Sequence, residues 1–152
     1  MAGRVDGKTA IIVGAGQTPG STIGNGRATA VLFAREGANV LCIDKRIDSA
    51  DETVALIEAE GHRASSFAAD VRRTDQCRLI AEEAERRLGR IDILVNNVGV
   101  GQGDAPPHAI EEEAWDRIME TNLKATAMTI RHVLPVMRRQ RSGAILNISS
   151  LA

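Results

Sequence analysis

The sequence lacks tyrosine and has few other aromatic residues or cysteines. Its 152 residues include two phenylalanines, one tryptophan and two cysteines. Cys42 lies in an apolar run and Cys77 in a charged helical stretch, so they form neither a Cys-x-x-Cys pair nor a disulfide framework, and we predict structural roles for both. The three histidines, His62, His108 and His132, are scattered along the chain. This spacing predicts no metal site.

Excess charge and long apolar runs are also missing. Nineteen basic and 20 acidic residues give a formal net charge of −1, which argues against a nucleic-acid-binding surface or an anionic-membrane surface. No apolar run approaches the roughly 18 residues of a membrane-spanning helix. The first six residues, Met-Ala-Gly-Arg-Val-Asp, have no apolar stretch of the kind found in signal peptides. We therefore expect one cytoplasmic domain, with no membrane and no nucleic-acid partner.

Short apolar segments alternate with helical patterns along the chain. The predicted strands are residues 9–13, 39–43, 64–68, 91–95 and 144–148, and the predicted helices are residues 26–36, 49–60, 74–88 and about 110–139. Continuous apolarity in all of these strands except 64–68 predicts burial on both faces. Gly37, Gly61 and Gly89 follow three of the helices, where left-handed residues commonly end the last turn. The pattern predicts an α/β fold with a doubly wound parallel sheet, whose ligand lies beyond the carboxyl ends of the strands.

A glycine-rich segment joins the first predicted strand to the first predicted helix. Glycine permits positive φ and lets a bulky anion approach, while the N–H groups at the start of the helix attract negative charge. The segment therefore predicts a phosphate-binding turn. Its five glycines are Gly14, Gly16, Gly20, Gly24 and Gly26.

Asp44 ends the second predicted strand, 20 residues after Gly24. A carboxylate at this spacing can accept hydrogen bonds from the hydroxyls of an adenosine ribose. A 2′-phosphate would meet like charge there, which favours NAD over NADP. Lys45 and Arg46 could pair with that phosphate, so NADP stays open as the less favoured cofactor. Alternatively, Asp44 only begins a turn and caps the next helix.

Together these motifs resemble the amino-terminal part of the classical short-chain dehydrogenase/reductase family, which has a Rossmann fold. The family's glycine signature, Thr-Gly-x-x-x-Gly-x-Gly, is approximated by Val13-Gly14 and Gly24-Asn25-Gly26. The resemblance implies that these glycines and Asn25 bind the cofactor. Nine residues, instead of three, separate the first two signature glycines. We expect this six-residue insertion to form a longer loop beside the pyrophosphate.

Two further motifs follow in the family's order. Asp70-Val71 resembles the acidic and apolar pair that receives the adenine ring, although Asp70 could instead cap the helix that begins near Thr74. The segment from Asn96 to Gly99 resembles the family's Asn-Asn-Ala-Gly element. The resemblance implies that this element supports the sheet and lines the cofactor site, and a tight turn would also use these residues.

Asn122 and Ser150 match the family's positions for two catalytic residues. The resemblance implies that Asn122 helps to organise a proton relay and that the Ser150 hydroxyl bonds to the substrate oxygen. Asn is a poor residue for a helix interior, so we predict that Asn122 bends the long helix and frees a carbonyl. An exposed, tolerated Asn122 is the alternative.

In this family the general acid/base is a tyrosine about a dozen residues after the serine, with a lysine four residues further on. This sequence has no tyrosine and ends at Ala152. We interpret residues 1–152 as the first three-fifths of a dehydrogenase, with five strands and a sheet that is incomplete at the carboxyl end. The parent protein would interconvert an alcohol and a ketone with NAD(P), and this chain alone would be inactive.

Two other function classes remain open. A non-catalytic dinucleotide-binding module fits the chain but does not need both Asn122 and Ser150. A methyltransferase-like transferase shares the glycine turn but does not explain the segment from Asn96 to Gly99. The family resemblance also implies a homo-oligomer, a dimer or a tetramer, that forms through the long fourth helix. The apolar residues of this predicted helix include Ile118, Leu123, Ile130 and Leu134.

Overall fold

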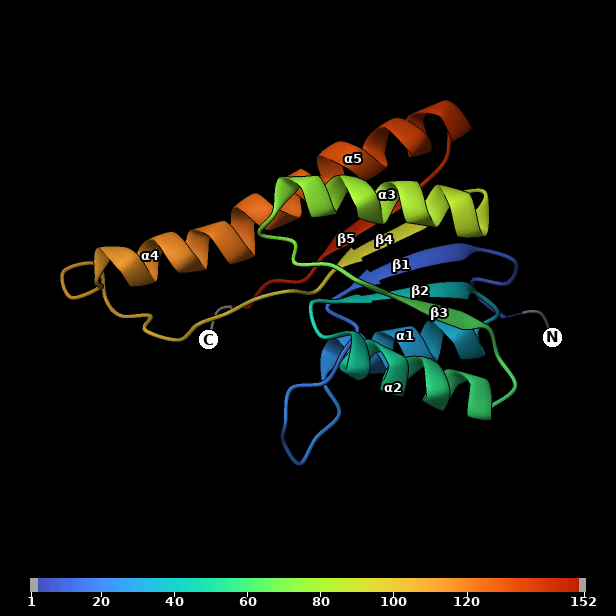
Figure 1. The fold of residues 1–152 in the computed structure, drawn as a ribbon, viewed down its shortest axis with the longest axis horizontal. Helices are drawn as coiled ribbons and strands as arrows, with labels where there is room; N and C mark the ends of the chain where they lie inside the picture. Colours follow the sequence, from blue (N-terminus) through green and yellow to red (C-terminus); the bar gives the residue numbers. More distant parts are fainter. Residues whose placement is uncertain (1–2, 151–152) are drawn as a thin grey trace.

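The computed structural model describes residues 3–150, which form a parallel five-stranded sheet in the order β3-β2-β1-β4-β5. Helices α1 and α2 cover one face of this sheet, and α3 and α5 cover the other (Figure 1). The predicted doubly wound α/β fold is confirmed. The elements are β1 Thr9–Val13, α1 Asn25–Arg35, β2 Asn39–Asp44, α2 Ile47–Ala59, β3 Ala64–Ala68, α3 Thr74–Leu88, β4 Ile93–Asn96, α4 Glu112–Met119, the π-helical η1 Glu120–Lys124, α5 Ala125–Gln140 and β5 Ala144–Asn147.

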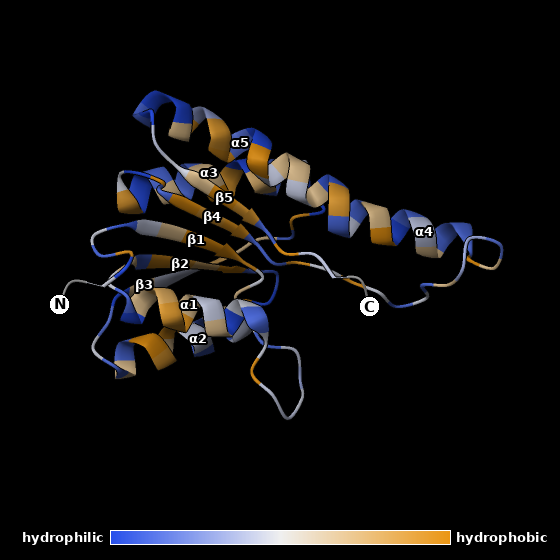
Figure 2. Cartoon of the chain, turned by 180° about the vertical axis from the view of Figure 1, so that it is seen from behind, coloured by the Kyte–Doolittle hydropathy of each residue, from blue (hydrophilic) through white to orange (hydrophobic). Residues whose placement is uncertain are grey.

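Strand β1 lies at the centre of the sheet, and all five of its residues are buried. Its side chains alternate between two apolar clusters, because neighbouring strand residues point to opposite faces. Ile11 packs in the cluster that contains Ile80 of α3 and Val133 of α5. Ile12 packs in the cluster that contains Ile57 of α2. Figure 2 shows these apolar strands between the two helical layers.

Several predicted boundaries are correct, and one strand start is wrong. Strands β1 and β3 and helix α3 have the predicted ends. Gly37, Gly61 and Gly89 have the predicted positive φ values of 92°, 80° and 73°. Strand β4 begins at Ile93, two residues later than predicted. The side chain of Gln140 takes the place of a strand neighbour at Ile91: Ile91 N–H donates to its Oε1 at 2.9 Å, and its Nε2 donates to the Ile91 carbonyl at 2.7 Å.

The predicted long helix over residues 110–139 is interrupted. Helix α4 passes into η1, a π-helical segment of five residues, and η1 passes into α5. Asn122, where the sequence predicts a bend, lies in η1, so the regular α-helix is interrupted at this residue. A π-helical segment inside an α-helix is rare and occurs often at functional sites.

The prediction that strand β5 is buried on both faces is wrong. Ile145 packs against the cluster on the α3 and α5 side, whereas Leu146 is 42% exposed and Ile148, just beyond the strand, is 49% exposed. The reason is that β5 is an edge strand paired only with β4. Helices α1 and α2 pack under β1, β2 and β3, toward the opposite edge of the sheet, and so do not cover β5 (Figure 1). Over residues 3–150, no helix is long and apolar enough to cross a membrane.

Candidate dinucleotide-binding site

The glycine-rich turn begins where β1 ends and brings the chain against β2. The N–H groups of Gly14 and Ala15 both donate to the Ile43 carbonyl, at 2.8 and 2.9 Å. Gly14 has a φ of +80°, and a Cβ there would come within 3.0 Å of the Val98 side chain. A Cβ at Gly26 would overlap the Gly14 carbonyl oxygen. Helix α1 therefore starts in direct contact with the turn because both positions are glycine.

The predicted longer loop is present. Residues 18–23 project from the glycine-rich turn beyond α1 and α2 (Figure 1). Gly24 is the N-cap of α1, with extended backbone angles, and Ala28 N–H donates to its carbonyl at 2.9 Å. Asn25 and Gly26 form the start of the helix, where backbone N–H groups have no intrahelical acceptor and can bind an anion.

The Asp44 side chain contacts the glycine-rich turn. Its Oδ2 accepts a hydrogen bond from Gly16 N–H, and its Oδ1 accepts one from Arg46 N–H, both at 3.0 Å. Asp44 therefore begins the turn between β2 and α2. It does not cap α2, whose N-cap residue is Arg46 with no side-chain cap bond. The Arg46 guanidinium points back to the same turn, where Nη2 donates to the Gln17 carbonyl at 2.6 Å.

Asp70 follows β3 and pairs with Arg72. Arg72 Nη2 lies 2.5 Å from Asp70 Oδ2, and Arg72 N–H also donates to Oδ1, at 3.1 Å. The hydrogen bond from Arg72 holds the pKa of this carboxyl below its usual value, although partial burial opposes the shift. Asp70 does not cap α3, whose N-cap residue is Arg73 with no side-chain cap bond. Val71 is buried beside it, with 6% exposure.

The last residue of β4 and the residue after it tie together three strands. Asn96 is buried, and its Nδ2 donates to Oδ1 of Asn147 at 2.9 Å, across from it in β5. Asn97 N–H donates to the Val13 carbonyl at 3.0 Å. Asn147 is not among the site residues predicted from the sequence. A polar residue at the end of an apolar strand is the signal that could have identified it.

Asn122 forms a two-way hydrogen bond with the backbone of Val100. Its Oδ1 accepts from Val100 N–H at 2.8 Å, and its Nδ2 donates to the Val100 carbonyl at 2.9 Å. Its own carbonyl accepts from the Thr126 hydroxyl at 3.1 Å. Gly99 lies beside this pair, since a Cβ there would be 3.8 Å from Asn122 Oδ1. The side chain thus joins η1 to the segment that leaves β4.

The predicted site residues gather at the edge of the sheet that the carboxyl ends of the strands form. Parallel strands end at a shared edge, and in this fold ligands bind beyond it. The glycine-rich turn follows β1, Asp44 ends β2, Asp70 follows β3, and Gly99 follows β4. Ser150 belongs to the same edge because it lies three residues beyond the carboxyl end of β5, and it is exposed. Asn122 is joined to this edge through its two hydrogen bonds to Val100.

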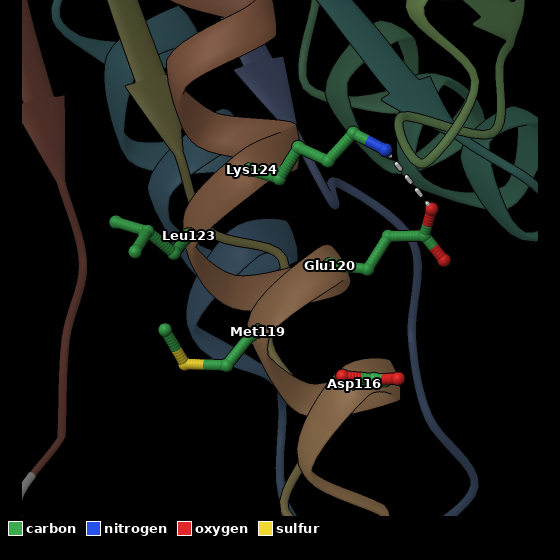
Figure 3. A pocket seen from close by; sticks show the side chains of 5 residues that line it. All are labelled: Asp116, Met119, Glu120, Leu123 and Lys124. Carbon is green, nitrogen blue, oxygen red and sulfur yellow. Dashed lines mark hydrogen bonds and ion pairs between the residues drawn. The ribbon is translucent and has the colours of Figure 1, made fainter. Parts of the chain in front are cut away.

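A separate surface hollow lies on the α4 and η1 helices. Figure 3 shows it lined by two apolar side chains and three charged ones, of which Lys124 and Glu120 form an ion pair at 3.3 Å. None of the predicted dinucleotide-binding residues lines it. The lining residues are Asp116, Met119, Glu120, Leu123 and Lys124.

The two cysteines lie in the interior of the fold. Cys42 and Cys77 are both buried, and they do not form a disulfide bond with each other. Burial raises the pKa of the Cys42 thiol to about 12, so this thiol stays protonated at neutral pH. No group of three or more His, Cys, Asp or Glu residues within the described part of the chain could hold a metal ion.

Comparison with known proteins identifies the family. The family described as short chain dehydrogenase matches residues 8–152, and the chain belongs to it. The 3-oxoacyl-[acyl-carrier-protein] reductase FabG of Thermotoga maritima is 36% identical over 148 residues, which cover 97% of this chain and 57% of that protein. The chain thus spans about half the length of the curated relatives it matches.

Two solved structures are similar in fold and differ in their cofactor. A 7α-hydroxysteroid dehydrogenase complexed with NADH and 7-oxo glycochenodeoxycholic acid has a TM-score of 0.87 at 34% identity, covering 97% of this chain and 55% of that one. A metagenomic short-chain oxidoreductase in complex with NADP has a TM-score of 0.86 at 33% identity, covering 97% of this chain and 64% of that one.

Proposed function

We propose that this chain is the dinucleotide-binding part of an oxidoreductase that interconverts an alcohol and a ketone, with NAD as the preferred cofactor. The observation that carries the proposal is the contact between the glycine-rich turn and Asp44, where Gly16 N–H donates to the carboxylate. The proposal is supported because the backbone of a glycine-rich turn suits a phosphate and the neighbouring carboxylate suits ribose hydroxyls. Membership of the short chain dehydrogenase family supports it.

The residues at this edge fit a dinucleotide. The start of α1, where the N–H groups of Asn25 and Gly26 have no intrahelical acceptor, suits the pyrophosphate, and glycine at positions 14 and 26 lets α1 begin against the turn. Asp44 suits the adenosine ribose, and the adenine ring would lie against Val71, with Asp70 shared between its amine and Arg72. NAD bound there supplies a nicotinamide that exchanges a hydride with the substrate. The remaining residues that we assign to cofactor binding are Gly24, Asn25, Asn96 and Gly99.

The preference for NAD rests on charge at the end of β2. The Asp44 carboxylate is held by two backbone N–H groups, so it cannot easily turn away from a 2′-phosphate. The Arg46 guanidinium, which is with Lys45 one of the two cations predicted to pair with that phosphate, donates instead to the Gln17 carbonyl. A 2′-phosphate would therefore face a fixed negative charge and would have to compete for the cation.

The catalytic roles that we propose are limited to two residues of this chain. The Ser150 hydroxyl hydrogen-bonds the substrate oxygen, and Asn122 positions the segment around Val100 that borders the site. The 152 residues contain no tyrosine to act as the proton donor. We propose that proton transfer uses residues of the complete protein outside this sequence, and that this chain alone does not turn over.

We also propose that the complete protein is a homo-oligomer that associates through the exposed face of α4, η1 and α5. Leu123 and Leu134, two of the predicted apolar residues, are 57% and 40% exposed, and Trp115 is 51% exposed. Ile130 instead packs against the core. Exposed large apolar side chains on one helical layer are typical of an association surface.

The test uses the complete protein, titrated with NADH and NADPH and assayed with a panel of small secondary alcohols. We expect Ser150→Ala to lower turnover at least about 100-fold with little change in NADH affinity. Ser142→Ala, in the turn before β5, is the matched control and should leave turnover within about twofold. Dinucleotide binding without turnover on any alcohol or ketone would instead support a non-catalytic module. Robust alcohol oxidation by the 152-residue chain would contradict the assignment of proton transfer to outside residues.

A further inference from the structure

Gln17 uses both ends of its side-chain amide within the expanded loop. Oε1 accepts a hydrogen bond from Gly24 N–H at 2.7 Å. Nε2 donates to the carbonyls of Thr18 and Thr22, at 2.7 and 2.9 Å. One side chain therefore binds the beginning and the end of the 18–23 segment and closes the loop on itself.

The backbone of Gln17 fixes this closed loop to the end of β2 and the start of α2. Its N–H donates to the Ser49 hydroxyl at 2.7 Å, and Ser49 is buried with 2% exposure. Its carbonyl accepts from Arg46 Nη2 at 2.6 Å. The preceding residue, Gly16, donates to Asp44 at 3.0 Å. Gln17 thus joins the loop to the corner that carries Asp44.

Closure of the loop determines where α1 begins. Gly24 is the N-cap of α1, and its N–H is the group that Gln17 Oε1 holds. The N–H groups of the next residues, Asn25 and Gly26, are the first of the helix, and such groups at a helix N-terminus can bind an anion. A six-residue insertion between the signature glycines would otherwise let Gly24 move relative to Gly14, because a longer loop has more conformations.

We propose that Gln17 is a positioning residue for the dinucleotide: its side-chain amide compensates for the inserted loop by fixing the α1 N-terminus where the pyrophosphate binds. This inference rests on the proposed dinucleotide-binding function. Gln17 acts through Gly24 and the loop and does not itself touch the reacting atoms.

The test measures affinity in the complete protein. We expect Gln17→Ala to weaken NADH binding, followed by fluorescence, about tenfold, because three hydrogen bonds that order the loop are lost. The affinity for ADP, measured by competition, should fall by the same factor. The affinity for adenosine, which has no phosphate, should change less than twofold. Gln17→Glu keeps the acceptor for Gly24 N–H but loses the donors and adds negative charge near the pyrophosphate. It should weaken NADH binding at least as much, and added salt should reduce that loss.

Gln140→Ala is the matched control. Gln140 also binds the backbone through both ends of its amide, but at Ile91, at the opposite end of the sheet. Its loss should lower the melting temperature and leave NADH affinity within twofold. Gln17→Ala should do the reverse, with a melting temperature close to that of the unaltered protein.

A second background isolates the mechanism. Deletion of residues 18–23 joins Gln17 directly to Gly24 and restores the family's spacing of three residues between the first two signature glycines. In that background Gln17→Ala should no longer change NADH affinity. An unchanged affinity of Gln17→Ala and Gln17→Glu in the full loop, or an equal loss after the deletion, would overturn the proposal. Failure of the unaltered protein to bind either dinucleotide would refute the proposed function itself.

Discussion

The carboxylate of Asp44 and the backbone N–H of Gly16 are joined by a 3.0 Å hydrogen bond, which connects the end of β2 to the glycine-rich turn after β1. A carboxylate in this position fixes the turn and, in the proposed site, also carries the charge that would select between NAD and NADP. Substitution separates the two roles in part, because an asparagine removes the charge and keeps one of the two oxygen acceptors, which can hold the Gly16 N–H.

Asp44→Asn should therefore change cofactor preference, with a loss of stability limited to one backbone hydrogen bond. We expect the ratio of the NADPH dissociation constant to the NADH dissociation constant to fall about tenfold, since the 2′-phosphate no longer meets like charge. Fluorescence titration of the complete protein with both reduced cofactors measures this ratio. Asp48→Asn is the control, because it removes an exposed charge from the first turn of α2 nearby. An equal shift in both variants would mean that general electrostatics, not the Asp44 contact, sets the preference.

Asn122→Ala should loosen the segment that leaves β4. The Val100 N–H and carbonyl lose their side-chain partners, so we expect hydrogen exchange at the Val100 amide to accelerate about fivefold. Hydrogen–deuterium exchange detected by NMR measures this rate. In the complete protein, Asn122→Ala should also lower turnover.

Two further variants separate this contact from the helix irregularity. Asn122→Asp keeps an acceptor for Val100 N–H and should retain most of the protection. Leu123→Ala alters an exposed neighbour in the same π-helical segment and should leave the Val100 amide unchanged. If Leu123→Ala accelerates exchange as much as Asn122→Ala does, the shape of η1 and not the Asn122 side chain protects Val100.

The sequence predicts elements well where local signals bound them. Strand β3 and helix α3 have their predicted ends because Gly61 precedes the first, an aspartate turn at Asp70 separates the two, and Gly89 ends the second. The order of the predicted dinucleotide-binding residues was also predictable, since each lies at or just after the end of a predicted strand. Their meeting at one edge then follows from parallel pairing.

Contacts between distant segments could not be predicted from local pattern. The late start of β4 depends on Gln140, which is 49 residues from Ile91. The π-helical form of η1 coincides with the pairing of Asn122 and Val100, 22 residues apart. Nothing in the periodicity around either site reports such a partner. The Arg72 contact with Asp70 is different, because a two-residue separation made it accessible to sequence reasoning.

Asp92 should make stability depend on acid pH. Burial raises the pKa of this carboxyl, but hydrogen bonds from Arg90 and Thr9 outweigh burial and leave the pKa below its usual value. The stabilisation is therefore fully present above the unfolded-state pKa of about 3.9 and is lost as pH falls through the lower folded-state pKa. We expect Asp92→Asn to lower the free energy of unfolding by about 2 kcal/mol at pH 7 and to flatten its fall below pH 4. Urea denaturation at a series of pH values measures both effects.

The control for this prediction is Asp75→Asn. Asp75 pairs with Arg73 at 3.3 Å, but both side chains are more than half exposed. Exposed ion pairs contribute little, so this variant should change the free energy of unfolding at pH 7 by less than about 0.5 kcal/mol. An acid dependence of Asp92→Asn that matches the unaltered protein would assign the effect to other carboxylates.

Gly26→Ala should damage both the fold and the site, because the start of α1 touches the glycine-rich turn. The added Cβ would overlap the Gly14 carbonyl oxygen and come within 2.7 Å of Asn97 Nδ2, so the helix or the turn must move. We expect a loss of about 3 kcal/mol in the free energy of unfolding, with NADH affinity lowered more than tenfold. Gly20→Ala is the control in the same loop, because its Cβ would meet only the Thr18 carbonyl oxygen, at 3.9 Å. Equal stability and affinity of the two variants would show that α1 does not need this close approach to bind a dinucleotide.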